Sequence, residues 1–258
     1  MTRDPSPALL DRIVALAKEA GAVILRYYEE GARVRTKADS SPVTEADDAA
    51  EAVILPELAR LEPEIPVVSE EAVAAGAVPD VSGGRFFLVD PLDGTREFLS
   101  RNGEFTVNIA LIEQGRPVLG VVHAPALGLT FAAYGHGTAT RERPGETARI
   151  IHCRKPKDGL VVVASRSHGD RKALDAYLSG RKVESIVPSG SSIKFCLVAA
   201  GEADLYPRLG PTMEWDTAAG QAVLEAANGS VETLDGKPLR YGKPGFSNPH
   251  FVAKGAPR

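Results

Sequence analysis

Acidic residues follow short apolar segments at three places in the chain, where a carboxylate would leave the edge of a buried core. The three groups are Glu70-Glu71, Asp90 with Asp93, and Asp216. A buried carboxylate is costly unless a cation or hydrogen-bond donors compensate it. Oxygen ligands of this kind suit Mg²⁺, which binds carboxylates and phosphate oxygens. Each group alone also has a structural interpretation, as a solvated loop, a turn or a helix cap, and for a single group we favour that one.

The segment Asp90-Pro-Leu-Asp-Gly-Thr95 carries the most specific of these patterns. We expect a turn here that brings two carboxylates and the backbone carbonyl of Leu92 toward one point. The chain then continues from Thr95 to Leu99 as a short helical pattern. Its first N–H groups, just after Gly94, would form a seat for phosphate at the same point. Metal-binding carboxylates that face a phosphate seat indicate metal-assisted hydrolysis of a phosphate ester.

Two amphipathic helices are expected before these groups. One covers residues 8–28, and the other runs from Glu45 toward Leu61, where Pro56 should kink it or end it early. Short strands are expected next, at residues 66–69, 85–90, 105–112, 116–123 and 130–134, with a hairpin at Gln114-Gly115 between the third and fourth.

From residue 160 onward, strand patterns alternate with helical ones, which indicates a layered α/β arrangement. The expected strands cover residues 160–164, 183–187 and 204–206, and the helices cover 170–178, 192–200 and 217–227. The segment 139–157 is rich in charge, Pro and Gly and separates this part from the first. We therefore expect an α/β (α+β) protein with an N-terminal part, residues 1–145, that carries most metal ligands, and a C-terminal part, residues 146–258, that carries Asp216.

Composition excludes several classes of protein. The 258 residues include 30 Lys and Arg against 34 Asp and Glu, a net charge of −4, so we expect no nucleic-acid partner that depends on bulk positive charge. The two cysteines, Cys153 and Cys196, support neither a disulfide framework nor a cysteine zinc site. No signal peptide and no integral membrane segment are expected. We expect a cytoplasmic protein, with peripheral attachment to the inner face of a membrane left open.

Two of the acidic segments resemble the signatures of a known family. Residues 90–95 and Trp215-Asp-Thr-Ala-Ala219 resemble those of the lithium-sensitive, magnesium-dependent phosphatases related to inositol monophosphatase. Further segments resemble more specifically the bacterial 3'(2'),5'-bisphosphate nucleotidases of the CysQ type. These segments are residues 41–47, 68–71, 102–111, 190–196 and 205–208. The resemblance runs from the first helix nearly to the C-terminus.

The resemblance implies a layered αβαβα sandwich and hydrolysis of the 3'-phosphate of adenosine 3',5'-bisphosphate to give AMP, a reaction linked to sulfate assimilation. The partner would be a small nucleotide, and the protein a monomer or homodimer. Two alternatives stay open. One is an inositol or other sugar monophosphatase, and the other is a non-catalytic protein that binds metal or nucleotide.

The resemblance also implies metal ligands. Glu70, Asp90 and the carbonyl of Leu92 would hold one Mg²⁺. Asp90, Asp93 and Asp216 would hold a second, and Glu70 would share a third, weaker ion. Glu71 is left without a firm role.

Asp47 and Thr95 would activate the attacking water, with the Thr hydroxyl orienting it and the Asp accepting its proton. Asp47 also lies three residues after Thr44, the spacing of a capping box, and the pattern alone favours capping. The two roles are compatible.

The substrate would be bound by the residues that follow strands in the second half and by the phosphate seat. These residues are Gly94, Thr95, Ser165, His168, Gly190, Ser191, Lys194 and Arg208. Their ordinary alternatives are a surface histidine, a plain helix N-cap at Gly190-Ser191 and a solvated helix lysine. Whether Arg208 contacts the substrate is left open.

Overall fold

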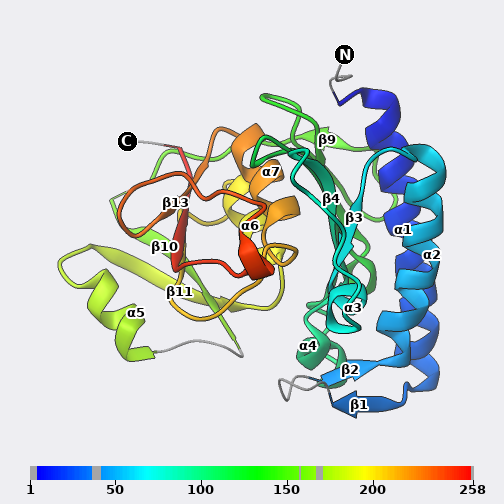
Figure 1. Cartoon of the computed structure of the whole chain (residues 1–258). Coiled ribbons are helices and arrows are strands. Elements are labelled where there is room, and N and C mark those ends of the chain that lie inside the picture. The colour runs from blue at the N-terminus through cyan, green and yellow to red at the C-terminus, as the bar shows by residue number, and fades with distance from the viewer. Residues whose placement is uncertain (1–4, 37–41, 157, 167–170, 257–258) are drawn as a thin grey trace.

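The computed structural model describes residues 5–36, 42–156, 158–166 and 171–256. In Figure 1 the chain forms a helical layer, a small sheet, a central helical layer, a large sheet and a second outer layer of long helices. The αβαβα sandwich that the resemblance implies is therefore confirmed. Among the described residues, none of the helices combines the length and the apolar character that a membrane span requires.

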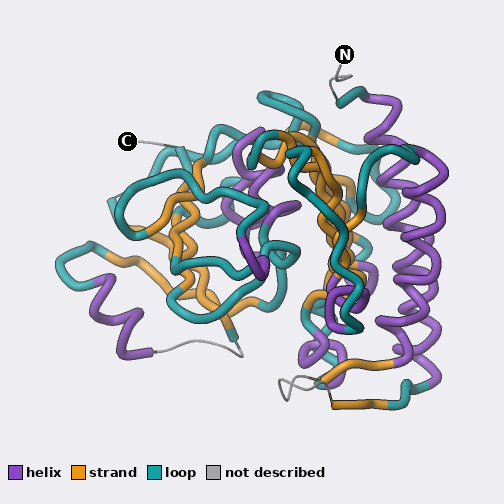
Figure 2. The backbone as a smooth tube through the Cα atoms, viewed as in Figure 1, coloured by secondary structure: helices purple, strands orange, loops and turns teal. Residues whose placement is uncertain are grey.

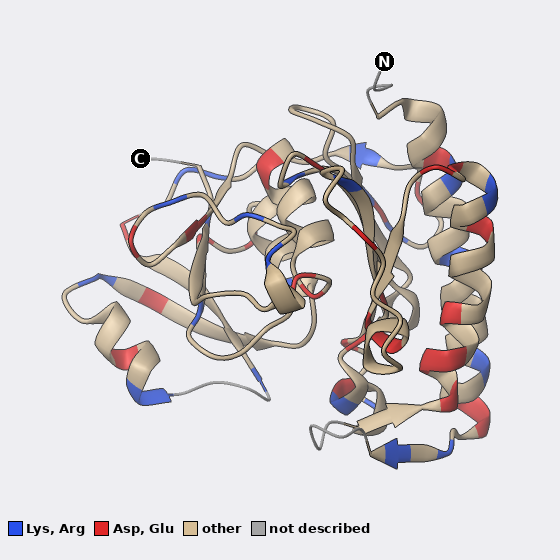
Figure 3. Ribbon diagram, in the orientation of Figure 1, with Lys and Arg blue, Asp and Glu red and all other residues tan. Residues whose placement is uncertain are grey.

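The outer helical layer consists of α1 (Pro7–Glu30) and α2 (Glu45–Leu61). Figure 3 shows that both helices carry acidic and basic residues, as expected of amphipathic helices. The helix α2 continues through Pro56, so of the two outcomes expected of this proline an early end is wrong, and a kink stays a prediction. Ile54 and Leu58, on either side of Pro56, are fully buried, and their packing offsets the hydrogen bond that proline cannot make.

The large sheet lies against this layer, and its strands have the order β3-β4-β5-β6-β7-β8-β9. Their bounds are β3 Val67–Ser69, β4 Arg85–Asp93, β5 Thr106–Glu113, β6 Arg116–Ala124, β7 Leu129–Ala133, β8 Thr140–Glu142 and β9 Arg149–Ile150. The pair β3 and β4 is parallel, and the other pairs are antiparallel. The hairpin at Gln114-Gly115 is confirmed. The short strands β8 and β9 were not expected from the sequence.

The small sheet has the order β11-β10-β12-β14-β13. Its strands are β10 Leu160–Ser165, β11 Val183–Ser189, β12 Leu205–Arg208, β13 Ser230–Thr233 and β14 Phe251–Lys254. The strand β10 runs parallel to both of its neighbours, and β14 pairs antiparallel with β12 and β13. The helix α5 (Arg171–Leu178) covers the outer face of this sheet.

Two helices, α6 (Ile193–Ala199) and α7 (Ala218–Ala226), separate the two sheets. The tube in Figure 2 shows the strands of the large sheet and of the small sheet with helical segments between them. Phe195 of α6 and Val223 of α7 belong to a single apolar cluster that also includes Phe86 of the large sheet and Phe251 of the small one. The core thus runs through the central layer and joins both sheets.

The remaining elements are short. They are β1 Val34–Thr36, β2 Pro42–Thr44, α3 Glu70–Ala74, α4 Thr95–Leu99 and the 3₁₀ turns η1 Pro125–Leu127 and η2 Pro244–Phe246. Of these, only the helical pattern after Gly94 was expected. Glu70 and Glu71 open the helix α3 and do not lie in a solvated loop.

Candidate active site

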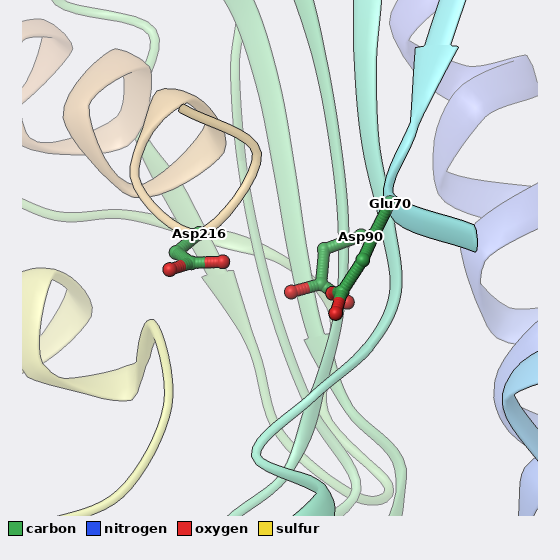
Figure 4. Close-up of side chains that lie close together, drawn as sticks. All are labelled: Glu70, Asp90 and Asp216. Carbon is green, nitrogen blue, oxygen red and sulfur yellow. The ribbon is translucent and has the colours of Figure 1, made fainter. Parts of the chain in front are cut away.

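Three carboxylates from separate segments meet at one point between the large sheet and the central helices. Glu70 opens α3, Asp90 lies in β4, and Asp216 precedes α7. One oxygen from each lies within 4.8 Å of the others. Figure 4 shows Glu70 and Asp90 close together, with Asp216 across from them. We call these three residues the acidic wall.

The strand pairing explains why two of these acids meet. The strands β3 and β4 are parallel neighbours with Ser69 opposite Val89, so the residues that follow, Glu70 and Asp90, emerge side by side. Asp216 is held separately, because its Oδ2 accepts a hydrogen bond from the Met213 amide at 2.8 Å.

The segment that follows Asp90 is a bulge, so the expected turn is wrong. Asp90 pairs with Asn108 and Asp93 with Thr106, which leaves two residues of β4 opposite one residue of β5. Asp90 Oδ1 accepts a hydrogen bond from the Leu92 amide at 3.0 Å, and both residues are almost completely buried. The bulge keeps the chain extended up to Asp93.

Burial and mutual repulsion dominate the electrostatics of the acidic wall. Desolvation, with the charges of Glu70 and Asp93, raises the pKa of Asp90 well above its usual range. Desolvation and the charges of Asp93 and Glu70 raise the pKa of Asp216 to about 8. A divalent cation would offset both the desolvation of these carboxylates and their mutual repulsion, because its positive charge would stabilise them in the ionised form. The donor set is three buried or half-buried carboxylates, which fits a hard cation such as Mg²⁺.

Asp93 lies beside this group but makes different contacts. Its Oδ2 accepts hydrogen bonds from the Ser192 amide at 2.6 Å and from Asn108 Nδ2 at 3.2 Å. Desolvation raises its pKa, while the charge of Lys194 opposes the increase. Asp93 therefore links the end of β4 to the start of α6. Its predicted role as a metal ligand stays a prediction.

Asp47 takes part in the capping box that the sequence pattern favoured. Its Oδ2 accepts hydrogen bonds from the Thr44 amide at 2.8 Å and the Thr44 hydroxyl at 2.7 Å. Its other oxygen, Oδ1, accepts a longer hydrogen bond from the Thr95 hydroxyl at 3.4 Å. Asp47 is only 2% exposed. The capping interaction fixes its position while leaving Oδ1 directed at Thr95, so the two expected roles are geometrically compatible.

A cavity of about 440 Å³ extends from these acids to residues of the C-terminal part. Its lining includes Ser165, Ser191, Lys194 and Arg208, which we call the cationic wall. Gly94, Thr95, Leu92 and Asp93 also line it. Of the other predicted substrate contacts, Gly190 donates its amide proton to Glu104 Oε2 at 2.8 Å, and His168 lies outside the described residues.

Lys194 and Arg208 bring two positive charges to the cavity. Lys194 is 4% exposed, so the expected alternative of a solvated helix lysine is wrong. Desolvation lowers its pKa to about 8, with a further lowering by Arg208. Its Nζ lies 5.4 Å from the centre of the Tyr206 ring. Arg208 Nη2 donates to the Pro211 carbonyl at 2.5 Å, whereas the buried Nε has no hydrogen-bond partner among the described residues.

Sequence reasoning missed Asn108 and Glu104. Asn108 Nδ2 donates to Asp93 and, at 2.9 Å, to Ser192 Oγ, so it holds two segments of the site together. Its signal in the sequence is weak, because it lies on the alternate face of a strand whose Phe105 and Val107 belong to the core. No local sequence pattern indicates the role of Glu104, because its partners Arg166 and Gly190 lie more than 60 residues away in the chain.

The sequence of this chain is similar to a known protein family over nearly its whole length. The profile of the inositol monophosphatase family matches residues 8–254. The 3'(2'),5'-bisphosphate nucleotidase CysQ of Escherichia coli (strain K12) is 48% identical over 246 residues, which cover 94% of this chain and 98% of that protein. The corresponding protein of Haemophilus influenzae is 33% identical over 96% of this chain and 93% of its own length.

Solved structures agree with this assignment. The crystal structure of CysQ from Bacteroides thetaiotaomicron matches with a TM-score of 0.79 and 38% identity, covering 95% of this chain and 97% of that one. The IMPase of Thermotoga maritima matches with a TM-score of 0.76 and 26% identity, covering 95% and 91% of the two chains.

Proposed function

Because this chain belongs to the inositol monophosphatase family, we propose that it hydrolyses the 3'-phosphate of adenosine 3',5'-bisphosphate to give AMP and inorganic phosphate. The similarity to CysQ nucleotidases over nearly the whole of both chains supports this activity. The observation that carries the substrate assignment is the pairing of an acidic wall with a cationic wall in one cavity. A metal site alone would serve any phosphate monoester, whereas two further cations suit a substrate with two phosphates.

The acidic wall would hold the metal. We assign Glu70, Asp90 and the Leu92 carbonyl to one Mg²⁺, and Asp90, Asp93 and Asp216 to a second, with Glu70 shared by a third and weaker ion. When bound, Mg²⁺ would polarise the phosphoryl group, lower the pKa of a bound water and stabilise the charge on the leaving oxygen. The raised pKa values of Asp90 and Asp216 support this assignment, because each carboxylate is stable in its buried position only with a compensating charge.

Asp47 and Thr95 would prepare the attacking water. The Thr95 hydroxyl donates a hydrogen bond to Asp47 Oδ1, and Thr95 lines the cavity. This contact places the Asp47 carboxylate next to the hydroxyl that would hold the water. The Thr95 hydroxyl would orient the water, and Asp47 would accept its proton. The capping interaction with Thr44 keeps Asp47 in place during this step.

The cationic wall would bind the rest of the substrate. Lys194 and Arg208 are buried cations that line the cavity, and both suit the 5'-phosphate. Ser165 and Ser191 would donate hydrogen bonds to the nucleotide, and Gly94 with Thr95 would seat the phosphate that is cleaved. An inositol or sugar monophosphate has one phosphate and would leave this wall without a partner.

Released phosphate tests the proposal directly. Purified protein with Mg²⁺ should hydrolyse adenosine 3',5'-bisphosphate far faster than inositol 1-phosphate, and lithium should inhibit it at Mg²⁺ concentrations that support turnover. Equal rates on the two substrates, or the reverse order, would reject the nucleotidase assignment. Binding without turnover would favour the non-catalytic alternative.

A further inference from the structure

One carboxylate outside both walls joins the two sheets, next to residues that line the cavity. Glu104 lies between α4 and β5, and its carboxylate accepts two hydrogen bonds from the Arg166 guanidinium, both at 3.0 Å. It accepts a third from the Gly190 amide at 2.8 Å. Arg166 follows β10 and Gly190 follows β11, which are parallel neighbours. A single side chain of the N-terminal part therefore holds the carboxyl ends of two strands of the small sheet.

The contact is closely packed as well as charged. A Cβ added to Gly190 would lie 2.5 Å from Glu97 Cγ and 2.8 Å from the Glu104 carbonyl oxygen, so no side chain fits there. Arg166 Nη2 also donates to the Pro188 carbonyl at 3.1 Å. A two-point guanidinium–carboxylate pair fixes orientation as well as distance.

The cationic wall and the segment that carries Thr95 both lie next to this contact. On the cationic side, Ser165 directly precedes Arg166, and Ser191 directly follows Gly190. On the other side, the Glu104 carbonyl oxygen would lie 3.2 Å from a Cβ added to Gly94, the residue before Thr95. Gly94 has φ +94°, a left-handed conformation that favours glycine, so this close approach is built into the backbone.

We propose that Glu104 is a positioning residue that, through Arg166 and Gly190, sets the separation between the cationic wall and the catalytic groups. The inference rests on the proposed function, since it assigns the cationic wall to the substrate. A substrate that contacts both walls then depends on Glu104. A small monoester such as p-nitrophenyl phosphate contacts only the metal side and does not.

The test compares these two substrates in Glu104→Gln, which keeps an acceptor for the Gly190 amide but removes the charged partner of Arg166. KM for adenosine 3',5'-bisphosphate should rise by about tenfold. This is the effect expected when displacement of the cationic wall weakens one charge-assisted hydrogen bond to the substrate. Its kcat should stay near the wild-type value, as should kcat/KM for p-nitrophenyl phosphate. Arg166→Met should act in the same direction, and the double variant should show less than the sum of the two effects.

A matched control is available in the small sheet. The Glu232–Lys254 ion pair has side-chain exposures of 29% and 42%, against 21% and 43% for Glu104 and Arg166. Neither Glu232, Lys254 nor their chain neighbours line the cavity, whereas Ser165, next to Arg166, does. Glu232→Gln should leave both substrates unaffected. Equal losses on the two substrates in Glu104→Gln, or an unchanged KM, would overturn the inference.

If circular dichroism shows that Glu104→Gln does not fold, Arg166→Met carries the test, because it leaves the Glu104–Gly190 hydrogen bond in place. If the wild-type protein hydrolyses neither substrate, the proposed function fails and AMP binding by calorimetry replaces KM. Unchanged AMP affinity in Glu104→Gln would then reject the positioning role.

Discussion

The acidic wall and the cationic wall face the same cavity but are held in place by different means. Glu70 and Asp90 meet because each directly follows a residue of the parallel pair Ser69 and Val89, so backbone hydrogen bonds of the sheet set their positions. Lys194 and Arg208 come from the central layer and the small sheet, and polar contacts such as Ser192 to Asp93 tie that side to the first. If the acidic wall holds the metal and the cationic wall binds the substrate, as proposed, the metal site depends on strand pairing, whereas substrate choice depends on a few side-chain contacts.

The largest effect should come from neutralising the acidic wall. In Asp90→Asn, phosphate release should fall by about three orders of magnitude or more, because the proposed metal site would lose a central ligand. The metal-free variant should have an unchanged or higher Tm, since the substitution removes a buried charge that its neighbours repel. A fully active variant would show that the acidic wall does not hold the catalytic metal.

Stability and metal binding should both depend on pH through Asp216 of the acidic wall. The pKa of Asp216 is raised to about 8, so the metal-free folded protein holds a proton there at neutral pH that the unfolded chain releases. Metal-free stability should therefore fall as pH rises toward 8. Mg²⁺ affinity should rise by about tenfold per pH unit below 8 for each proton displaced. Calorimetry in buffers of different ionisation enthalpy measures the proton release, and its absence would contradict this account.

Substitution in the cationic wall should affect binding more than chemistry. Lys194→Met retains the length of the side chain and should raise KM for adenosine 3',5'-bisphosphate by about 10- to 100-fold, the loss of a charged hydrogen bond. Hydrolysis of p-nitrophenyl phosphate should change little. Similar losses on both substrates would mean that Lys194 serves the catalytic groups and that the two walls are not separate in function.

The smallest effect should come from the cap of α2. Thr44→Val removes the hydroxyl that bonds to Asp47 Oδ2 and to the Ala46 amide, and it should cost about 1 kcal/mol of unfolding free energy. Activity should decrease only modestly, because the Thr44 amide still holds Asp47. Asp47→Asn should instead abolish most activity. If both variants lose the same activity, Asp47 contributes to activity only through the helix cap and not as a proton acceptor. Denaturant unfolding and phosphate release provide the two measurements.

Local patterns were sufficient to predict much of the fold. Helices α1 and α2 show a 3.6-residue apolar period, and β5 with β6 flank a two-residue turn, so their signals lie within a few neighbouring residues. The strands β13 and β14 have four residues each and pair only through the sheet, which leaves no local signal to detect. The division between residues 145 and 146 stays a prediction.

By itself, the sequence determined the identity of the acids, the capping box at Thr44 and Asp47, and the family to which the chain belongs. These features depend on residue types and short spacings, which folding does not alter. Only the tertiary structure decided that Pro56 stays inside a helix, that Asp90 and Asp93 flank a bulge, and that Lys194 is buried. It also decided that Glu104 meets Arg166 and Gly190. Each of these outcomes depends on packing between segments far apart in the chain, and no local pattern encodes the free energy of such contacts.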